Sequence, residues 1–275
     1  MALVTAEDCR KSLDNRAVRL ERLVKEGEAL HAKGQLTLRN LDALRESALL
    51  DLYTSFELFL EDLFFAVLLG SSGISDSGGV VNFSDREQAE EILTGGNQYL
   101  IWLPFDKNGK GVLPLAKRLL KDGRPFTRIE RHKDELDTLE ELRIVRNAIA
   151  HRSSSARAAL EPFVTHLRQR RRTAAGLLEQ VRQGQSQYES YSATVRQIGV
   201  ALASAEDALA RKFLSPERPY APKANAPTGR YRCTRCAKRH QIRAKTAALP
   251  ACPVCRKGRA KGQPKVAQEW DRVYA

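Results

Sequence analysis

The sequence has no apolar run long enough to cross a membrane. A membrane-spanning helix needs about 18 or more consecutive apolar residues, and the most apolar stretch of this 275-residue chain, residues 43–69, contains six charged side chains. No basic segment leading into an apolar one opens the chain, so no secretory signal is visible. Hydrophobic residues make up 42% of the sequence, which is typical of a globular protein. We therefore expect a cytoplasmic protein that does not span a membrane.

Acidic residues are absent from a long C-terminal stretch. Between Glu217 and Glu269 the chain has 14 lysine and arginine residues and no aspartate or glutamate. The whole chain has a net charge of +13, so the remainder carries 13 − 14 = −1. A basic block of this kind predicts affinity for a polyanion. A solvated, disordered tail is the alternative.

Cysteine is also scarce, and four of the five cysteines lie within 23 residues. Cys233 and Cys236 form one C-x2-C pair, and Cys252 and Cys255 form another. Two such pairs can place four thiolates tetrahedrally around one ion, which predicts one structural Zn²⁺ per chain in a small zinc ribbon. A thioredoxin-like redox site would need a C-x-x-C motif within a βαβ unit, and none is evident.

Basic side chains surround these cysteines. Phosphate contacts made by such charges are largely independent of base sequence, so the ribbon is a candidate nucleic-acid-binding module. A protein-docking or purely structural module is the alternative. The candidate contact residues are Arg232, Arg235, Lys238, Arg239, Arg256 and Lys257.

The rest of the chain has helical periodicity, which predicts an all-α domain over residues 1–214. Four prolines mark residues 215–228 as an extended linker, followed by the ribbon over residues 229–262 and a tail over residues 263–275. The predicted helices cover residues 5–34, 43–69, 86–93, 113–122, 133–150, 161–183 and 186–214, with a long, partly ordered excursion over residues 71–112.

Apolar spacing selects candidate core residues in the long helices. In the first helix they are Leu13, Val18, Leu20, Leu23, Val24 and Leu30. In the second they are Leu49, Leu52, Phe56, Phe59, Leu60, Leu63 and Val67, and in the helix over residues 133–150 they are Leu136, Leu139, Leu142, Val145 and Ile149.

The end of the helix over residues 133–150 carries Arg146 followed by a polar residue, Asn147, and then His151. This pattern resembles the R-x4-6-H signature of HEPN ribonucleases, although Arg235 and His240 in the ribbon have the same spacing. Residues 53–60 and 123–126 are similar to segments of RiboL-PSP-HEPN proteins. The resemblance covers about residues 43–165 and leaves the first helix, the last helix and the ribbon outside it.

The resemblance implies an endoribonuclease built on a HEPN-like helical bundle, with no metal needed for catalysis. In that chemistry the 2′-hydroxyl of RNA attacks the neighbouring phosphate, which leaves a 2′,3′-cyclic phosphate and a 5′-hydroxyl. An imidazole can transfer the proton near neutral pH, and a guanidinium can hold the charge that develops on the phosphoryl oxygens. These roles fall to His151 and Arg146, with Asn147 for orientation and Glu57 as a candidate helper. Arg143 and Arg152 are candidate phosphate contacts.

Helix geometry adds a constraint. At about 100° per residue, Asn147 and His151 share a helix face, whereas Arg146 lies about 140° from His151. A regular helix would not aim both side chains at one phosphate, so either the helix ends near Ala150 or a second subunit contributes. In HEPN nucleases two such motifs meet across a symmetric dimer, so the resemblance implies an RNA-cleaving homodimer with a toxin-like or antiviral role. A neutralising or docking protein partner would fit that role.

Two alternatives stay open. The bundle and ribbon could form a non-catalytic adaptor that binds nucleic acid or docks onto a protein, with Arg146 and His151 making structural hydrogen bonds. The chain could also be a regulatory partner whose ribbon binds DNA. Cleavage of RNA, and its loss when His151 is replaced, would separate the nuclease from both.

Overall fold

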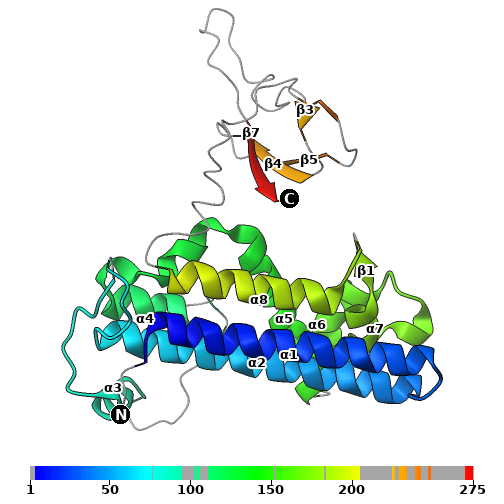
Figure 1. Ribbon diagram of the computed structural model, residues 1–275, viewed down its shortest axis with the longest axis horizontal. Helices are drawn as coiled ribbons and strands as arrows, with labels where there is room; N and C mark the ends of the chain where they lie inside the picture. The colour runs from blue at the N-terminus through cyan, green and yellow to red at the C-terminus, as the bar shows by residue number, and fades with distance from the viewer. Residues whose placement is uncertain are drawn as a thin grey trace, which may run out of the picture. The chain divides into compact units, whose positions relative to one another are not determined.

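The computed structural model describes residues 4–75, 77–94, 102–103, 105, 111–151, 153–182 and 184–204, together with five short strand segments beyond them. Two long antiparallel helices, α1 (Ala6–Ala32) and α2 (Leu38–Leu68), lie side by side (Figure 1). α1 begins at a capping box, in which Thr5 accepts a hydrogen bond from the backbone of Asp8 and Asp8 accepts one in return. The side chain of Thr37 caps α2 in the same position.

The buried face of α1 differs from the predicted one. Val18, Leu23 and Leu30, which the periodicity places in the core, are 43–45% exposed. Smaller residues take their place: a Cβ on Gly27 would lie only 2.3 Å from Leu44 of α2, so the glycine allows the two helices to approach closely. The buried residues of α1 are Ala6, Cys9, Leu13, Ala17, Leu20, Val24 and Gly27.

The excursion after α2 carries α3 (Arg86–Thr94), and α4 (Val112–Leu119) follows it. The predicted helix over residues 113–122 is shorter than expected, because residues 121–123 form a 3-10 turn, η1. Arg86 fastens α3 to α2 through an ion pair of 2.7 Å with Glu61. The indole N–H of Trp102 donates to the same carboxylate at 2.9 Å. The described parts of the excursion are therefore docked on the C-terminal half of α2.

The 3-10 helix η2 (Phe126–Arg131) leads into α5 (Lys133–His151). Residues 123–126, which resemble a segment of RiboL-PSP-HEPN proteins, lead into η2, and Gly123 among them has a φ of 67°, which favours glycine. Of the predicted stripe of α5, Leu139, Leu142 and Val145 are buried, and Leu136 and Ile149 are intermediate. This helix carries the Arg–His motif at its C-terminal end.

The prediction of one continuous helix over residues 161–183 is wrong. The chain instead forms α6 (Ser154–Val164), the 3-10 turn η3 (Gln169–Arg171), α7 (Ala174–Glu179) and a hairpin of β1 (Val181–Arg182) and β2 (Gln185–Ser186). Local capping explains the difference. Ser153 accepts from the N–H of Ala156 and starts α6 early, and Thr173 accepts from the N–H of Gly176 to start α7. Pro162 therefore lies inside α6 rather than in the first turn of a helix.

The last described helix of the bundle is α8 (Gln187–Ala203), and residues 205–214 of its predicted length lie outside the described residues. Side-chain contacts fix the helix directions: α1 is antiparallel to α2 and to α8, and α8 is antiparallel to α5. It follows that α5 is antiparallel to α2. The contacts are Arg45–Glu28 and Arg16–Asp51, Ser192–Glu21 and Arg196–Asp14, and Tyr191–Glu141 and Arg128–Ala201.

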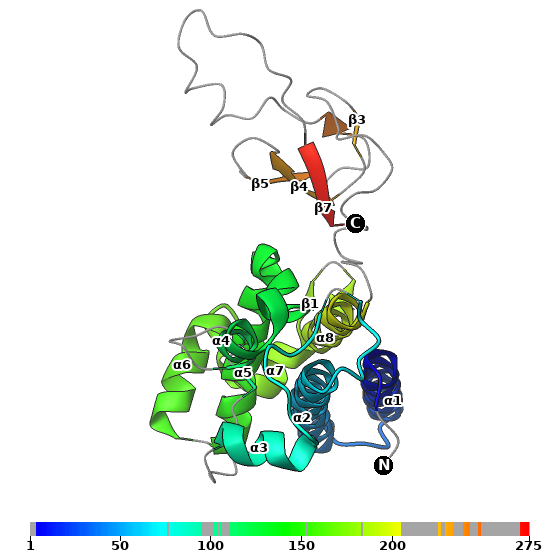
Figure 2. The same ribbon diagram turned by 90° about the vertical axis from the view of Figure 1, so that its left-hand side faces the viewer.

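The core sits around α2, against which α1, α4, α5, α7 and α8 pack (Figure 2). The predicted stripe of α2 is confirmed: Leu49, Leu52, Phe56, Phe59, Leu60, Leu63 and Val67 are each at most 3% exposed. This unit is helical, as the all-α prediction requires. Within the described residues, none of the helices is both long and apolar enough to span a membrane.

Residue contacts divide the chain into Met1–Ala208 and Leu209–Ala275, a few residues before the predicted boundary at residue 214. In the second unit, β4 (Gly229–Cys233), β5 (Arg239–Ile242) and β7 (Trp270–Tyr274) form an antiparallel sheet in the order β5-β4-β7, and β3 (Asn225–Ala226) pairs with β6 (Ala247–Ala248). The segments predicted as linker and tail thus contribute β3 and β7. Trp270, Val273 and Tyr274 are residue types that favour strands.

Candidate functional site

The three residues of the predicted Arg–His motif lie together at the end of α5. Nη1 of Arg146 donates to Oδ1 of Asn147 at 3.1 Å and contacts Nε2 of His151 at 3.3 Å. A guanidinium has only donors, so Nε2 of His151 is the acceptor in this contact. His151 is exposed, and Arg146 and Asn147 are partly exposed. The cluster therefore presents to solvent a guanidinium group beside an imidazole.

The expectation that one helix cannot bring Arg146 and His151 together is wrong. α5 continues as a helix through His151, and the two backbone positions are about 140° apart around its axis. The guanidinium, however, stands at the end of a long side chain, which carries it back around the helix to the imidazole. A second chain is not needed for the two groups to meet.

Tyr53 of α2 packs against the guanidinium. Cζ of Arg146 lies 5.2 Å from the centroid of the tyrosine ring, within the range of a cation–π interaction. Tyr53 is 3% exposed, and burial together with the charge of Glu57 raises the pKa of its hydroxyl group. In the sequence, Tyr53 is marked only by its place in a predicted helix and in the segment 53–60 that resembles RiboL-PSP-HEPN proteins. Its role depends on the packing of α5 against α2, which no local pattern shows.

One edge of the Arg146 guanidinium has no partner among the residues that the structure describes. No hydrogen bond or ion pair joins its Nε and Nη2 groups to any described residue. That edge can bind a carboxylate or a phosphate through two parallel hydrogen bonds. In Arg143 it is occupied, because Nε and Nη2 donate to Glu140 at 2.8 and 2.7 Å. Arg10 binds Glu7 in the same way. Among these three arginines, Arg146 alone is ready to receive an anion from solution.

Glu57, the candidate helper, lies one helical turn after Tyr53 on α2 and is partly buried. Burial raises the pKa of its carboxyl group, and the positive charge of Arg146 opposes that rise. The carboxyl group therefore lies within electrostatic reach of the guanidinium without forming an ion pair with it. Glu57 therefore interacts electrostatically with Arg146 but does not occupy the Nε and Nη2 groups of the guanidinium.

The other predicted contact residues are less uniform. Arg143 is paired with Glu140, which raises the pKa of its guanidinium and occupies its binding edge. Arg232 and Arg239 are backbone partners on neighbouring strands β4 and β5. The remaining predicted contacts, Arg152, Arg235, Lys238, Arg256 and Lys257, lie outside the described residues.

Of the four predicted zinc ligands, Cys233 is the last residue of β4, and Cys236, Cys252 and Cys255 lie outside the described residues. β5, the antiparallel neighbour of β4, begins at Arg239, so the first C-x2-C pair spans the connection of a hairpin. Within the described residues, no three His, Cys, Asp or Glu side chains gather as metal ligands.

Cys9 has surroundings of a different kind. Its side chain is buried in the face of α1 that packs in the core, and burial raises the pKa of the thiol to about 12. A thiol with so high a pKa is not a ready nucleophile or ligand. Cys9 therefore acts as a small core residue.

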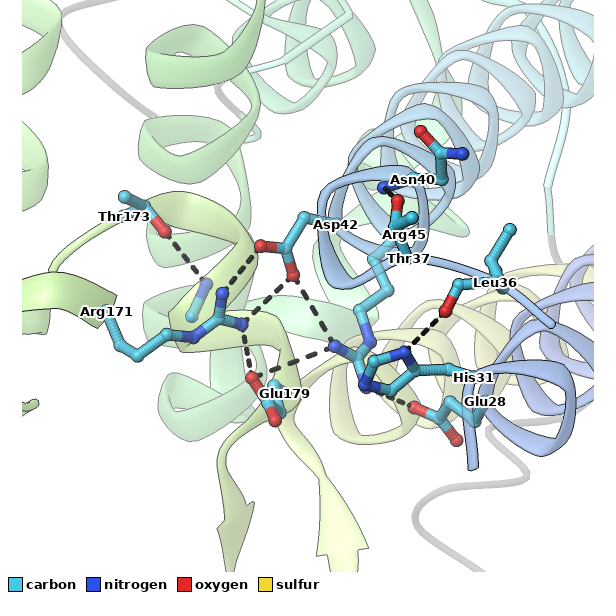
Figure 3. A network of polar contacts seen from close by, with 11 residues as sticks. Glu28, His31, Leu36, Thr37, Asn40, Asp42, Arg45, Arg171, Thr173 and Glu179 are labelled. Atoms are coloured by element: carbon cyan, nitrogen blue, oxygen red, sulfur yellow. Dashed lines mark hydrogen bonds and ion pairs between the residues drawn. The ribbon is translucent and has the colours of Figure 1, made fainter. Parts of the chain in front are cut away.

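A second arginine cluster lies near the start of α2 and differs from the site (Figure 3). Arg45, which is 5% exposed, donates to Glu28 at 2.8 Å and lies 3.7 Å from both Asp42 and Glu179. Arg171 of η3 binds Asp42 through two hydrogen bonds of 2.5 and 3.0 Å and also pairs with Glu179. Two guanidinium groups and three carboxylates thus join α1, α2, η3 and α7.

No protein-family model matches the chain, and no curated protein and no solved structure matches it either.

Proposed function

We propose that this chain is a metal-independent endoribonuclease of the HEPN type. The observation that carries the proposal is the Arg146–His151 pair, a guanidinium with a free binding edge whose Nη1 lies 3.3 Å from Nε2 of an exposed imidazole. One group can bind a phosphate, and the other can take a proton beside it. A pair that only braced the bundle would be buried and fully hydrogen-bonded, as Arg45 nearly is.

The chemistry follows from these positions. Nε and Nη2 of Arg146 bind two oxygens of the scissile phosphate and stabilise the charge that grows on them. Nε2 of His151 gives up its contact with Nη1 of Arg146 and takes the proton of the 2′-hydroxyl as the hydroxyl oxygen attacks phosphorus. The bond from phosphorus to the 5′-oxygen breaks, and that oxygen takes up a proton from the solvent. Asn147 and Tyr53 hold the guanidinium in place, and the products are a 2′,3′-cyclic phosphate and a 5′-hydroxyl.

The test is RNA cleavage by the full-length chain in the presence of excess EDTA. We expect the fragments to carry 5′-hydroxyl ends, which a polynucleotide kinase labels without prior dephosphorylation. His151→Ala and Arg146→Ala should each slow cleavage by about 10²- to 10³-fold, the usual contribution of a general base or of one charge-stabilising donor. A 2′-deoxy substitution at the cleaved position should block the reaction.

His166→Ala and Arg10→Ala are matched controls. His166 is an exposed histidine whose Nε2 contacts Gln180 at 2.9 Å and an arginine, Arg182, at 3.4 Å, and Arg10 is an arginine paired with Glu7. Both should cleave at the parental rate. If RNA binds but stays intact in every preparation, the adaptor reading holds instead. If duplex DNA binds in preference and no RNA is cut, the chain is a DNA-binding regulator.

We also propose that the active form is a homodimer with a toxin-like or antiviral role, controlled by a neutralising partner. Support comes from the resemblance of residues 43–165 to HEPN nucleases, not from the geometry of the site, which is assembled within one chain. Light scattering under cleavage conditions should give twice the chain mass of 30.8 kDa. Full activity at the mass of one chain would refute the dimer.

The second unit is proposed to hold one structural zinc ion. Four thiolates in two C-x2-C pairs form a closed tetrahedral donor set, which suits zinc and leaves no position for substrate. The hairpin of β4 and β5 next to Cys233 supports this assignment. Metal analysis of the purified chain should find one zinc per chain, and a Cys236→Ser variant should hold less.

A further inference from the structure

Arginines without acidic partners are concentrated in one part of the bundle. Residues 153–186 contain six arginines but only two acidic residues, Glu161 and Glu179, and Glu179 is already paired with Arg171. Three exposed arginines, Arg168, Arg170 and Arg172, lie in η3 or directly beside it, and none forms an ion pair with a described residue. We call these three residues the basic turn.

The segment that carries the basic turn is anchored to α2 and α7. Arg171, between Arg170 and Arg172, pairs with the carboxylates of Asp42 and Glu179. The N–H of Arg171 donates to the carbonyl of Arg168 at 2.7 Å. A Cβ at Gly176 would lie only 2.0 Å from the carbonyl oxygen of Arg171, so the turn is seated tightly against the start of α7. Arg171 therefore anchors the segment, and the three arginines of the basic turn remain exposed to solvent.

The position of this turn relative to the Arg146–His151 pair follows from α2. Asp42, which anchors the turn, and Tyr53, which packs against Arg146, are 11 residues apart on that helix. Eleven residues correspond to about 16 Å along the axis and to a rotation of only about 20°, so both side chains leave the same face of α2.

The direction of α5 places His151 between the two. Because α5 is antiparallel to α2, the step from Arg146 to His151 leads towards the N-terminal end of α2, where Asp42 lies. Five residues of helix cover about 7–8 Å, roughly half of the distance between Tyr53 and Asp42. Arg146, His151 and the basic turn therefore follow one another along one line.

We propose that this line is the path of the RNA, and that the basic turn binds phosphates of the strand that continues beyond the cleaved bond on the His151 side. The substrate is then single-stranded RNA that is several nucleotides long rather than a dinucleotide. This inference rests on the proposed function, since it assigns the substrate of the same site.

The experiment uses RNA that cannot be cleaved because its 2′-hydroxyls are methylated. Fluorescence anisotropy measures its affinity for the full-length chain, both as a dinucleotide and as a longer oligonucleotide, at several salt concentrations. The test variant is Arg168→Glu/Arg170→Glu. The matched control is Arg19→Glu/Arg118→Glu, which reverses two exposed arginines without ion-pair partners in the described residues, one on α1 and one on α4.

The test variant should bind the longer oligonucleotide on the order of tenfold more weakly, and its salt dependence should be shallower by about 1.4 in the log–log slope, or about 0.7 for each lost phosphate contact on a single strand. Dinucleotide binding should be unchanged, and the control variant should lose less than about threefold at either length. Equal losses in the two variants would mean that overall charge acts, and would overturn the proposal. A loss confined to duplex DNA would also overturn it, in favour of a DNA contact.

Failure of the proposed function leaves a different trace. If the His151→Ala chain cleaves as fast as the parent, the assigned site is wrong, whatever the oligonucleotides show. If the parent cleaves RNA and depends on His151, but the basic turn can be reversed without loss of affinity, the path is wrong and the site stands.

Discussion

The two arginine clusters along α2 use the same side chain in opposite ways. Near the start of the helix, Arg45 and Arg171 lie among three carboxylates, and the positive charge is neutralised where it stands. Further along, Arg146 is held by a tyrosine ring, an amide oxygen and an imidazole nitrogen, none of which carries a negative charge in this arrangement.

This difference separates a structural arginine from one prepared for a ligand. A guanidinium that is already bound to carboxylates would have to give them up before it could bind a phosphate. A guanidinium positioned by neutral groups keeps its orientation and its charge together. The contacts of Arg146 position its guanidinium without an ion pair, so its positive charge is available to an incoming anion.

The largest expected effect on stability belongs to the first cluster. Arg45→Met should lower the free energy of unfolding by about 3 kcal/mol, the lower end for a broken buried ion pair, because the carboxylates left behind are partly exposed. Urea unfolding followed by circular dichroism measures the change. RNA cleavage below the unfolding transition should stay within about twofold of the parent, since Arg45 does not touch the site.

Arg22→Met is the control for Arg45. Arg22 is also paired, with Glu26 in the next turn of α1, but its side chain is 82% exposed. An exposed pair of this kind contributes about 0–1 kcal/mol. Loss of cleavage in a folded Arg45→Met chain would show that the two clusters are coupled and would break the comparison.

A smaller effect is expected at Tyr53. Tyr53→Leu should slow RNA cleavage about tenfold, because a partly desolvated cation–π contact contributes about 1–2 kcal/mol to holding the guanidinium. Tyr53→Phe keeps the ring and should cleave within about twofold of the parent. A ring at this distance should also shift the resonances of the Arg146 side chain upfield in NMR spectra, and we expect that shift to persist in the phenylalanine variant and to vanish in the leucine variant.

Phe56→Leu provides the control for Tyr53. It removes a similar ring from the same buried face of α2 without touching Arg146. If cleavage falls as much in Phe56→Leu as in Tyr53→Leu, the effect comes from a loosened core, and Tyr53 has no special part in positioning the arginine.

The smallest effect is a pH dependence at Glu57. Burial raises the pKa of this carboxyl group, so the folded state favours its protonated form. The stability that this gives is present below the ordinary pKa of a glutamate and is lost as the pH rises through the raised value. The side chain of Glu57→Gln cannot ionise. The melting temperature of this variant, measured relative to that of the parent, should therefore increase as the pH rises from about 4 to about 7.

Glu189→Gln should behave in the opposite way. The backbone N–H of Ser186 and the side chain of Lys25 lower the pKa of Glu189, which favours its charged form in the folded state. The variant should therefore melt below the parent at neutral pH, and the difference should shrink as the pH falls through the lowered pKa. If the melting temperatures of both variants, relative to that of the parent, change in the same direction with pH, the surroundings assigned to Glu57 are wrong.

The sequence predicted what depends on neighbours along the chain. Helical periodicity identified α2 and its buried stripe, and the motif picked out the residues that meet at the end of α5. The network around Arg45 and Arg171 could not be predicted from the sequence, because its members come from four separate elements. The error at residues 161–183 arose because cap residues, Ser153 and Thr173, decide where helices start, whereas periodicity alone gives one continuous segment.

The objection to Arg146 and His151 meeting on one helix failed for a related reason. It compared the directions in which side chains leave the backbone and ignored the length of arginine. The prediction for α1 was wrong because it gave too much weight to large side chains: Val18 and Leu23 were expected in the core but are exposed. Glycine and alanine on the other face allow the backbone of α2 to come close, so burial follows backbone proximity rather than side-chain size.

The end of α8 has a mechanical consequence. Nη1 of Arg128 in η2 binds the carbonyl oxygens of Ala201 and Ser204 at 3.2 and 2.6 Å, and so joins the last described turn of α8 to η2. Because η2 leads directly into α5, this contact restrains the first turn of that helix. His151 is at the opposite end of α5, so the restraint acts at a distance from the groups that would cut RNA.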